Sequence, residues 1–134
     1  MKLAENVVYP VMVTKKFLAI IQKHILNVVP KECGMITVSF RDPDYSAEEG
    51  GYHPVEVAVD QNGKVMYVTD FAFFGCPPFC ELAKCMDFDF REGRYQDAHS
   101  YQPIATARSL YRVFQMNFCS YYDWNIFEVT VTAE

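Results

Sequence analysis

The feature that most constrains the fold is the dipeptide Asn62-Gly63, which lies between two apolar stretches. Asn-Gly is preferred in two-residue hairpin turns, because both positions require a positive φ. Pro54–Val59 precedes it with valine at every second residue, and the long, largely apolar stretch Val65–Phe74 follows it. The sequence therefore predicts an antiparallel β-hairpin here.

A two-residue turn also fixes which residues face each other across this hairpin. The expected pairs are Gln61–Lys64, Val59–Met66, Val57–Val68, Val55–Asp70 and His53–Ala72. The last four pairs share one face, which is apolar except for His53 and Asp70, diagonal neighbours at one end. A carboxylate on an apolar face costs several kcal/mol unless it is paired, so Asp70 needs a partner, which His53 is placed to supply. The pair is either a structural clasp that holds the preceding loop at the end of the sheet or part of a functional site. Glu56, Tyr67, Thr69 and Phe71 should lie on the opposite face, and a one-residue change in the turn would separate His53 from Asp70.

Periodicity predicts the remaining elements. A helix is expected over Thr14–Val29, capped by Thr14 and ended by Pro30, and a second one begins near Pro103. Further strands are expected at Met35–Phe40, Met86–Arg91 and Ile126–Thr132, with a hairpin at Glu92-Gly93 that returns through Tyr95–Ala98. We expect one α+β domain over residues 1–134, with an antiparallel sheet of about five or six strands and two amphipathic helices on one face.

Composition excludes several functional classes. The chain has 134 residues, a net charge of -5 and no run rich in Lys or Arg, which argues against nucleic-acid binding. It shows neither a stretch long enough to span a membrane nor a signal peptide, so we expect a soluble, cytoplasmic protein. Its five cysteines are an odd number without regular spacing, which favours reduced thiols over disulfides.

Cys76, Cys80 and Cys85 follow a C-x3-C-x4-C spacing. Zinc sites usually show two close Cys pairs, or one Cys pair with a His pair, and here only one spacing fits. We therefore expect free thiols, with no metal and no cofactor. Cys119 is expected on the polar face of the second helix, and Cys33 on a connection.

The segment 41–52 is rich in polar side chains and contains Gly50-Gly51. A long polar loop with adjacent glycines is suited to binding a ligand or a partner. The alternative is an Ω-like loop in which Asp42-Pro43 forms a turn and the side chains cap their own backbone. Both interpretations remain open at this stage.

The block from Phe40 to Glu56 reads FRDPDYSAEEGGYHPVE. It resembles a small bacterial family of domains of unknown function, whose members carry an FRDPxYSAExGGYHPVE-like stretch. Tyr67–Phe71, Asp87–Phe90 and Asn117–Tyr122 fit the same resemblance. The resemblance implies a bacterial protein and carries no assigned reaction or site residue.

Two functional hypotheses follow. The first is a non-enzymatic interaction or ligand-binding module that uses the 41–52 loop, with a protein or small-molecule partner and possible homo-oligomerisation. The second is a small hydrolase-like enzyme in which His53 is the base, Asp70 orients it and Ser46 is the nearest candidate nucleophile. The second requires His53 and Asp70 in hydrogen-bond contact within an open pocket. The candidate binding residues are Arg41, Asp42, Tyr45, Ser46, Glu48, Tyr52, His53, Glu56 and Asp70.

Overall fold

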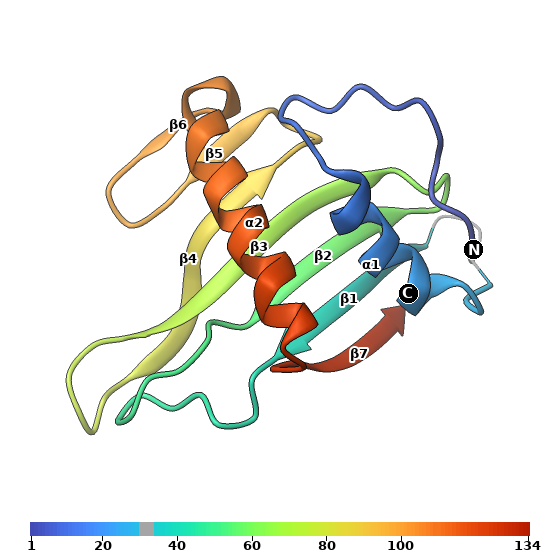
Figure 1. Cartoon of the computed structure of the whole chain (residues 1–134). Coiled ribbons are helices and arrows are strands. Elements are labelled where there is room, and N and C mark those ends of the chain that lie inside the picture. Colours follow the sequence, from blue (N-terminus) through green and yellow to red (C-terminus); the bar gives the residue numbers. More distant parts are fainter. Residues whose placement is uncertain (30–33) are drawn as a thin grey trace.

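A seven-stranded antiparallel sheet organises the computed structural model, which describes residues 1–29 and 34–134 (Figure 1). The spatial order is β6-β5-β4-β3-β2-β1-β7, so the first six strands form a meander and the last strand joins the free edge of β1. The strands are β1 Met35–Arg41, β2 Val55–Asp60, β3 Val65–Phe74, β4 Glu81–Asp89, β5 Arg94–Gln96, β6 Tyr101–Pro103 and β7 Glu128–Ala133. Short connections between consecutive strands favour this antiparallel pairing.

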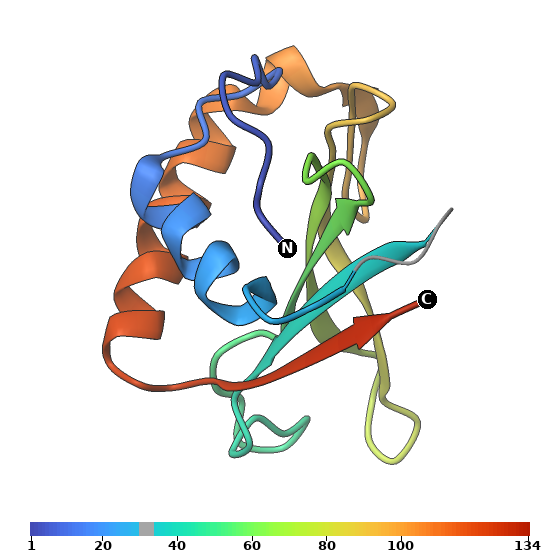
Figure 2. The ribbon, with the colours of Figure 1, turned by 90° about the vertical axis from the view of Figure 1, so that its right-hand side faces the viewer.

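Both helices lie on one face of the sheet, and within the described residues no helix covers the other face (Figure 2). Helix α1 spans Lys15–Ile25, and α2 spans Arg108–Asp123 and follows a 3-10 turn, η1, at Ile104–Ala107. Their amphipathic patterns account for this, because each helix buries one apolar stripe against the sheet. The predicted α+β class is confirmed, with seven strands rather than five or six.

Thr14 begins α1 as predicted, because its hydroxyl accepts a hydrogen bond from Phe17 N at 3.1 Å. The helix ends at Ile25, so the predicted extension to Val29 is wrong. Pro30, the expected helix stop, and Cys33 lie outside the described residues.

Aromatic rings fill the space between the helices and the sheet. Phe40 of β1 meets Phe118 of α2 edge to face at 4.9 Å between ring centroids. Phe17 of α1 packs on Phe118 at 5.7 Å, and Phe88 of β4 packs on Tyr111 at 5.0 Å. All five side chains are almost completely buried. Such offset and edge contacts each add about 0.5–1.5 kcal/mol to simple burial, so this cluster fixes α2 on the sheet.

The hairpin between β2 and β3 differs from the prediction at its turn. Gly63 N donates to Asp60 O at 3.0 Å and Asp60 N donates to Lys64 O at 2.9 Å, so the turn has three residues rather than two. The Asp60 carboxylate accepts hydrogen bonds from Asn62 N and Lys64 N, which stabilises this longer turn. The predicted Gln61–Lys64 and Val59–Met66 pairs are therefore wrong.

A bulge then restores the predicted register. Val59 pairs with Val65 and Ala58 with Tyr67, which leaves Met66 as the extra residue on β3. Beyond it, Val57 pairs with Val68 and Val55 with Asp70, as predicted. The same register continues for one more position, where Phe71 N donates to Pro54 O at 2.9 Å. The predicted His53–Ala72 pair is not among the paired residues of the ladder.

The sheet is more extensive than predicted in the second half of the chain. Strand β4 begins at Glu81 rather than Met86, because the break after β3 is confined to the loop from Gly75 to Cys80. Its first residues are exposed, so only backbone pairing with β3 specifies them. The return strand β5 is shorter than predicted, and β6 was missed because three residues show no periodicity.

Candidate functional site

His53 and Asp70 meet at the end of the helix-covered face, as the hairpin register predicted. His53 Nδ1 lies 3.0 Å from Asp70 Oδ2. Asp70 is 3% exposed, and its Oδ1 accepts a hydrogen bond from Met86 N at 2.7 Å. The hydrogen bond to Asp70 raises the pKa of His53, against the opposing effect of partial burial. The pair thus combines a buried, fixed carboxylate with a partly exposed imidazole.

Tyr45 packs against the ring of His53. The two rings lie 5.6 Å apart between centroids, and Tyr45 stacks on Phe73 of β3 at 5.2 Å. The Tyr45 hydroxyl accepts a hydrogen bond from Phe73 N at 3.0 Å. Tyr45 therefore ties the loop to β3 and fixes the orientation of His53.

The rest of the loop is largely held by its own side chains. The Asp42 carboxylate accepts hydrogen bonds from Asp44 N at 2.9 Å and from Tyr52 N at 3.0 Å. Ser46 Oγ accepts from Glu49 N at 3.0 Å. These contacts fit the self-capped Ω-like interpretation for Asp42 and Ser46. Their polar atoms position the backbone of the loop.

A cavity of about 390 Å³ lies between the sheet and α2, beside the His53–Asp70 pair. Its lining is mainly apolar and aromatic, with polar groups from His53, Asp70 and Asn117 in addition to the hydroxyls of its two tyrosines. The loop supplies Tyr52, whose ring packs on Tyr121 of α2 at 4.6 Å. The lining residues are Gly51, Tyr52, His53, Val55, Asp70, Met86, Leu110, Val113, Phe114, Asn117, Phe118, Tyr121 and Phe127.

Cys85 joins the pair through a second bulge. Asp70 pairs with Met86 and Phe71 with Lys84, so Cys85 is the extra residue of β4. A bulge re-aims the side chain of its extra residue, and the donor atoms of His53, Asp70 and Cys85 all lie within 4.8 Å of one another. Burial, followed by the negative charges of Asp70 and Asp97, raises the pKa of the Cys85 thiol. This environment disfavours the thiolate, which is the nucleophilic form of cysteine.

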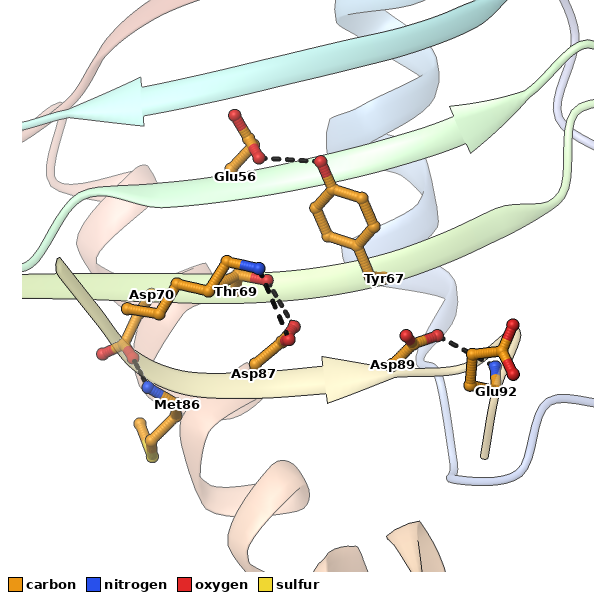
Figure 3. A network of polar contacts seen from close by, with 9 residues as sticks. Glu56, Tyr67, Thr69, Asp70, Met86, Asp87, Asp89 and Glu92 are labelled. Carbon is orange, nitrogen blue, oxygen red and sulfur yellow. Dashed lines mark hydrogen bonds and ion pairs between the residues drawn. The ribbon is translucent and has the colours of Figure 1, made fainter. Parts of the chain in front are cut away.

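Glu56 points to the opposite face of the sheet, as predicted (Figure 3). Its carboxylate accepts a hydrogen bond from the Tyr67 hydroxyl at 2.8 Å, and Thr69 Oγ1 donates to Asp87 at 2.7 Å. Figure 3 shows these contacts running across β2, β3 and β4. Glu56 is thus separated from His53 by the sheet.

Two further candidates lie apart from the pair. Arg41 is exposed at the end of β1, opposite Glu128 of β7, and Glu48 is exposed near the tip of the loop. Of the nine predicted residues, the structure brings together Tyr45, Tyr52, His53 and Asp70. Asp42 and Ser46 support the loop backbone, and Glu56 faces away.

The sequence analysis missed the contribution of α2 to the cavity. Leu110, Val113, Asn117 and Tyr121 are spaced by three or four residues, which places them on one helical stripe beside Phe114 and Phe118. That stripe was a signal present in the sequence, since its spacing is visible without the structure. Cys85 gave no such signal, because a bulge has no sequence periodicity.

The cysteines correct one further expectation. Cys119 is 6% exposed and packs in the core, so its predicted place on a polar helix face is wrong. Cys76, Cys80, Cys85 and Cys119 are all free thiols. Across residues 1–29 and 34–134, none of the helices has the length and apolar character needed to cross a membrane.

Comparison with protein-family models assigns the chain to a family. The model of the protein-of-unknown-function family DUF2787 matches residues 15–132, so the chain belongs to that family. No curated protein matches the chain.

Two solved structures from Vibrio cholerae are similar over nearly the whole chain. A hypothetical protein of the VSP-II pathogenicity island is 33% identical with a TM-score of 0.82, and a conserved hypothetical protein of island VPI-2 is 34% identical with a TM-score of 0.76. Each similarity covers 94% of this chain and 98% of the other. The second protein is described as sharing structural homology with the human P32 protein. These relatives support the fold and a bacterial family, and both are described as hypothetical.

Proposed function

We propose that this protein is a non-enzymatic module that binds a small molecule in the cavity between the sheet and α2. The observation that carries the proposal is the cavity itself, about 390 Å³ in volume and lined mainly by apolar groups around a few polar ones. Ligand sites in proteins typically combine such a volume with a few convergent polar groups. The 41–52 loop takes part through Gly51 and Tyr52, which form one wall.

The lining indicates the chemical class of the ligand. Phe114, Phe118 and Tyr121 offer aromatic surface, while His53, Asp70 and Asn117 offer hydrogen-bond donors and acceptors. We therefore propose a ring-containing, mostly apolar molecule that carries one hydrogen-bonding group. A small molecule is favoured over a protein partner because the polar groups converge inside a concave site.

The free cysteines bear on where this binding takes place. All four described cysteines are free thiols, which supports a reducing, cytoplasmic location. Any ligand would then be an intracellular molecule.

The test is a screen of ring-containing fragments by two-dimensional NMR, with a chelator present throughout. Val113 lines the cavity and is 51% exposed, so V113Y should narrow the opening with little effect on the core. Hits should lose affinity at least about tenfold in V113Y, which corresponds to about 1.4 kcal/mol. The matched control is M116Y on the same helix, at a 62% exposed residue outside this cavity. Equal affinity for V113Y and the wild type, or equal loss in both variants, would contradict the proposal.

The hydrolase-like alternative keeps one specific observation in its favour, the 3.0 Å contact between His53 and Asp70 at an accessible cavity. The two candidate nucleophiles for this hydrolase-like reaction are Ser46 and Cys85, and neither environment favours attack. Ser46 Oγ caps the loop backbone, and the environment of Cys85 favours the protonated thiol. Hydrolysis of a p-nitrophenyl ester that disappears in H53Q would support an enzyme, and equal rates in wild type and H53Q would contradict it.

A further inference from the structure

We infer that His53, Asp70 and Cys85 form a binding site for a divalent transition metal ion of the zinc type. The three side chains come from three successive segments of the sheet: the approach to β2, strand β3 and strand β4. Their donor atoms, one imidazole nitrogen, one carboxylate oxygen and one thiol sulfur, all lie within 4.8 Å of one another. Neighbouring strands thus bring together three ligand types that are far apart in the sequence.

The donor set selects the metal. Imidazole, carboxylate and thiolate are the ligands that bind Zn²⁺, at distances of about 2.0–2.3 Å. Mg²⁺ and Ca²⁺ prefer oxygen ligands throughout, so a site with sulfur and nitrogen donors disfavours them. The mixed set suits a divalent transition metal ion such as Zn²⁺, for which Co²⁺ is a spectroscopic substitute.

The present geometry is close to what such an ion requires. Zinc bond lengths at tetrahedral angles place donor atoms about 3.3–3.6 Å apart. His53 Nδ1 and Asp70 Oδ2 are already 3.0 Å apart. A rotation of the Cys85 side chain would close the remaining gap, since this residue lies in a bulge rather than in the regular ladder.

Neighbouring groups also orient two of the ligands, as hydrogen bonds and packing around metal ligands usually do. Met86 N donates to Asp70 Oδ1 at 2.7 Å, which leaves Oδ2 directed at His53. Tyr45, stacked on Phe73, packs against the His53 ring. These supports restrict both side chains before any ion binds.

The charges around Cys85 favour a cation. The Asp70 carboxylate lies within 4.8 Å of the Cys85 sulfur, so a cation bound between them would be attracted by a negative charge. A divalent ion would reverse the local charge and bind the sulfur as thiolate, with the thiol proton released to solvent. His53 would bind through Nδ1, the nitrogen that faces Asp70, and carry its proton on Nε2.

Three protein ligands leave a fourth position open. His53 and Asp70 also line the cavity, so that position is available to water or to a donor atom of a cavity ligand. The metal site does not depend on the proposed ligand, because its three donors all belong to this chain.

The experiment is a Co²⁺ titration of the full chain, reduced with a phosphine and freed of metal with a chelator that is then removed. We expect saturation at one ion per chain, with a near-ultraviolet sulfur-to-cobalt charge-transfer band and visible bands of a tetrahedral site. C85S should abolish the charge-transfer band. H53Q should weaken Co²⁺ binding at least about 100-fold, since even the loss of a supporting group costs 10–100-fold.

The matched control is C76S, which removes an exposed thiol in the β3–β4 loop. It should leave the stoichiometry, the spectrum and the affinity unchanged. H53Q is the second variant, since the His53 side chain is 41% exposed and its loss should not unfold the protein. The absence of saturable binding, a charge-transfer band that persists in C85S, or one that disappears in C76S would overturn the inference. The fragment screen is run with a chelator and tests the proposed small-molecule binding, whereas this titration tests the metal site. A negative result in one experiment therefore does not decide the other.

Discussion

His53 Nδ1 and Asp70 Oδ2 lie 3.0 Å apart, although 17 positions separate the two residues in the sequence. The contact follows from the β2–β3 register, which pairs Val55 with Asp70 and brings the preceding segment alongside. Asp70 is 3% exposed, and without His53 and Met86 N its buried carboxylate would have no hydrogen-bond partner. The contact should therefore contribute to stability, and His53 and Asp70 also line the cavity.

Substitution of this pair should show energetic coupling. H53Q and D70N, made singly and together in metal-free buffer, should each destabilise the fold, D70N by about 1–3 kcal/mol because it disturbs a buried acceptor. The coupling energy from the double-mutant cycle should lie between about 0.5 and 3 kcal/mol. Urea unfolding measures all four proteins. Additive effects of the two substitutions would show that the contact contributes nothing to stability.

A side chain at Gly51 should destabilise the 41–52 loop. The φ of Gly51 is +134°, and a Cβ there would lie 2.9 Å from Asp42 Oδ2 and 3.0 Å from Tyr45 Cα. G51A should therefore cost about 1–3 kcal/mol and break the hydrogen bond between Asp42 and Tyr52 N. The adjacent control is G50A, since Gly50 also has a positive φ, +75°, but has no atom within 4 Å of the added Cβ. Thermal unfolding should show a larger loss for G51A, and equal losses would refute the steric explanation.

Gln115 should be important for stability although it is polar. It is 2% exposed, its Oε1 accepts from Thr14 N at 3.1 Å, and its Nε2 donates to Met12 O at 3.1 Å. Q115M keeps the size but leaves both backbone groups unsatisfied, so we expect a loss of about 1–3 kcal/mol. R112M, on the exposed side of the same helix, should change stability by no more than about 0.5 kcal/mol. Chemical denaturation compares the two, and a neutral Q115M would contradict the bridging role.

His24 should make the fold sensitive to acid. Burial, and then the charge of Lys23, lower its pKa below the ordinary 6.5, and its Nε2 lies 2.8 Å from the Tyr122 hydroxyl. A lowered pKa means that the folded state prefers neutral histidine. The stability that neutral His24 contributes is therefore fully present above the pKa that His24 has in the unfolded chain. It is lost as the pH falls from there towards the lower pKa of His24 in the folded protein.

The control for His24 is H24F, which keeps a ring against Phe40 and Tyr122 but cannot titrate. Between about pH 8 and pH 5.5, the wild type should lose stability relative to H24F, as followed by thermal unfolding. A constant difference across this range would show that His24 does not titrate on unfolding.

The β2–β3 hairpin shows how far the sequence analysis reached. Asn62-Gly63 identified the hairpin, but Asp60 side-chain hydrogen bonds select a three-residue turn. The Met66 bulge compensates for the extra turn residue, so the His53–Asp70 contact was predicted correctly. Such compensation depends on pairing with β2 and β4, which local patterns do not contain.

The candidate site was predictable only in part for the same reason. Tyr45, Tyr52 and His53 lie in one distinctive segment, and the hairpin register places Asp70 beside them. Cys85 instead reaches the pair through a bulge in another strand. The cavity wall from α2 depends on how the helix crosses the sheet. That crossing is set by aromatic packing such as Phe40 on Phe118, which no single segment specifies.

The most direct test of the proposed function is to locate a bound fragment by intermolecular nuclear Overhauser effects to Leu and Val methyl groups. The proposal predicts contacts to Val55, Leu110 and Val113, which line the cavity. Leu26 and Leu82 are internal controls in the same labelled sample, since they are 57% and 44% exposed and lie outside it. Contacts to the first group alone would place the ligand beside His53 and Asp70. Contacts confined to Leu26 or Leu82 would contradict the account.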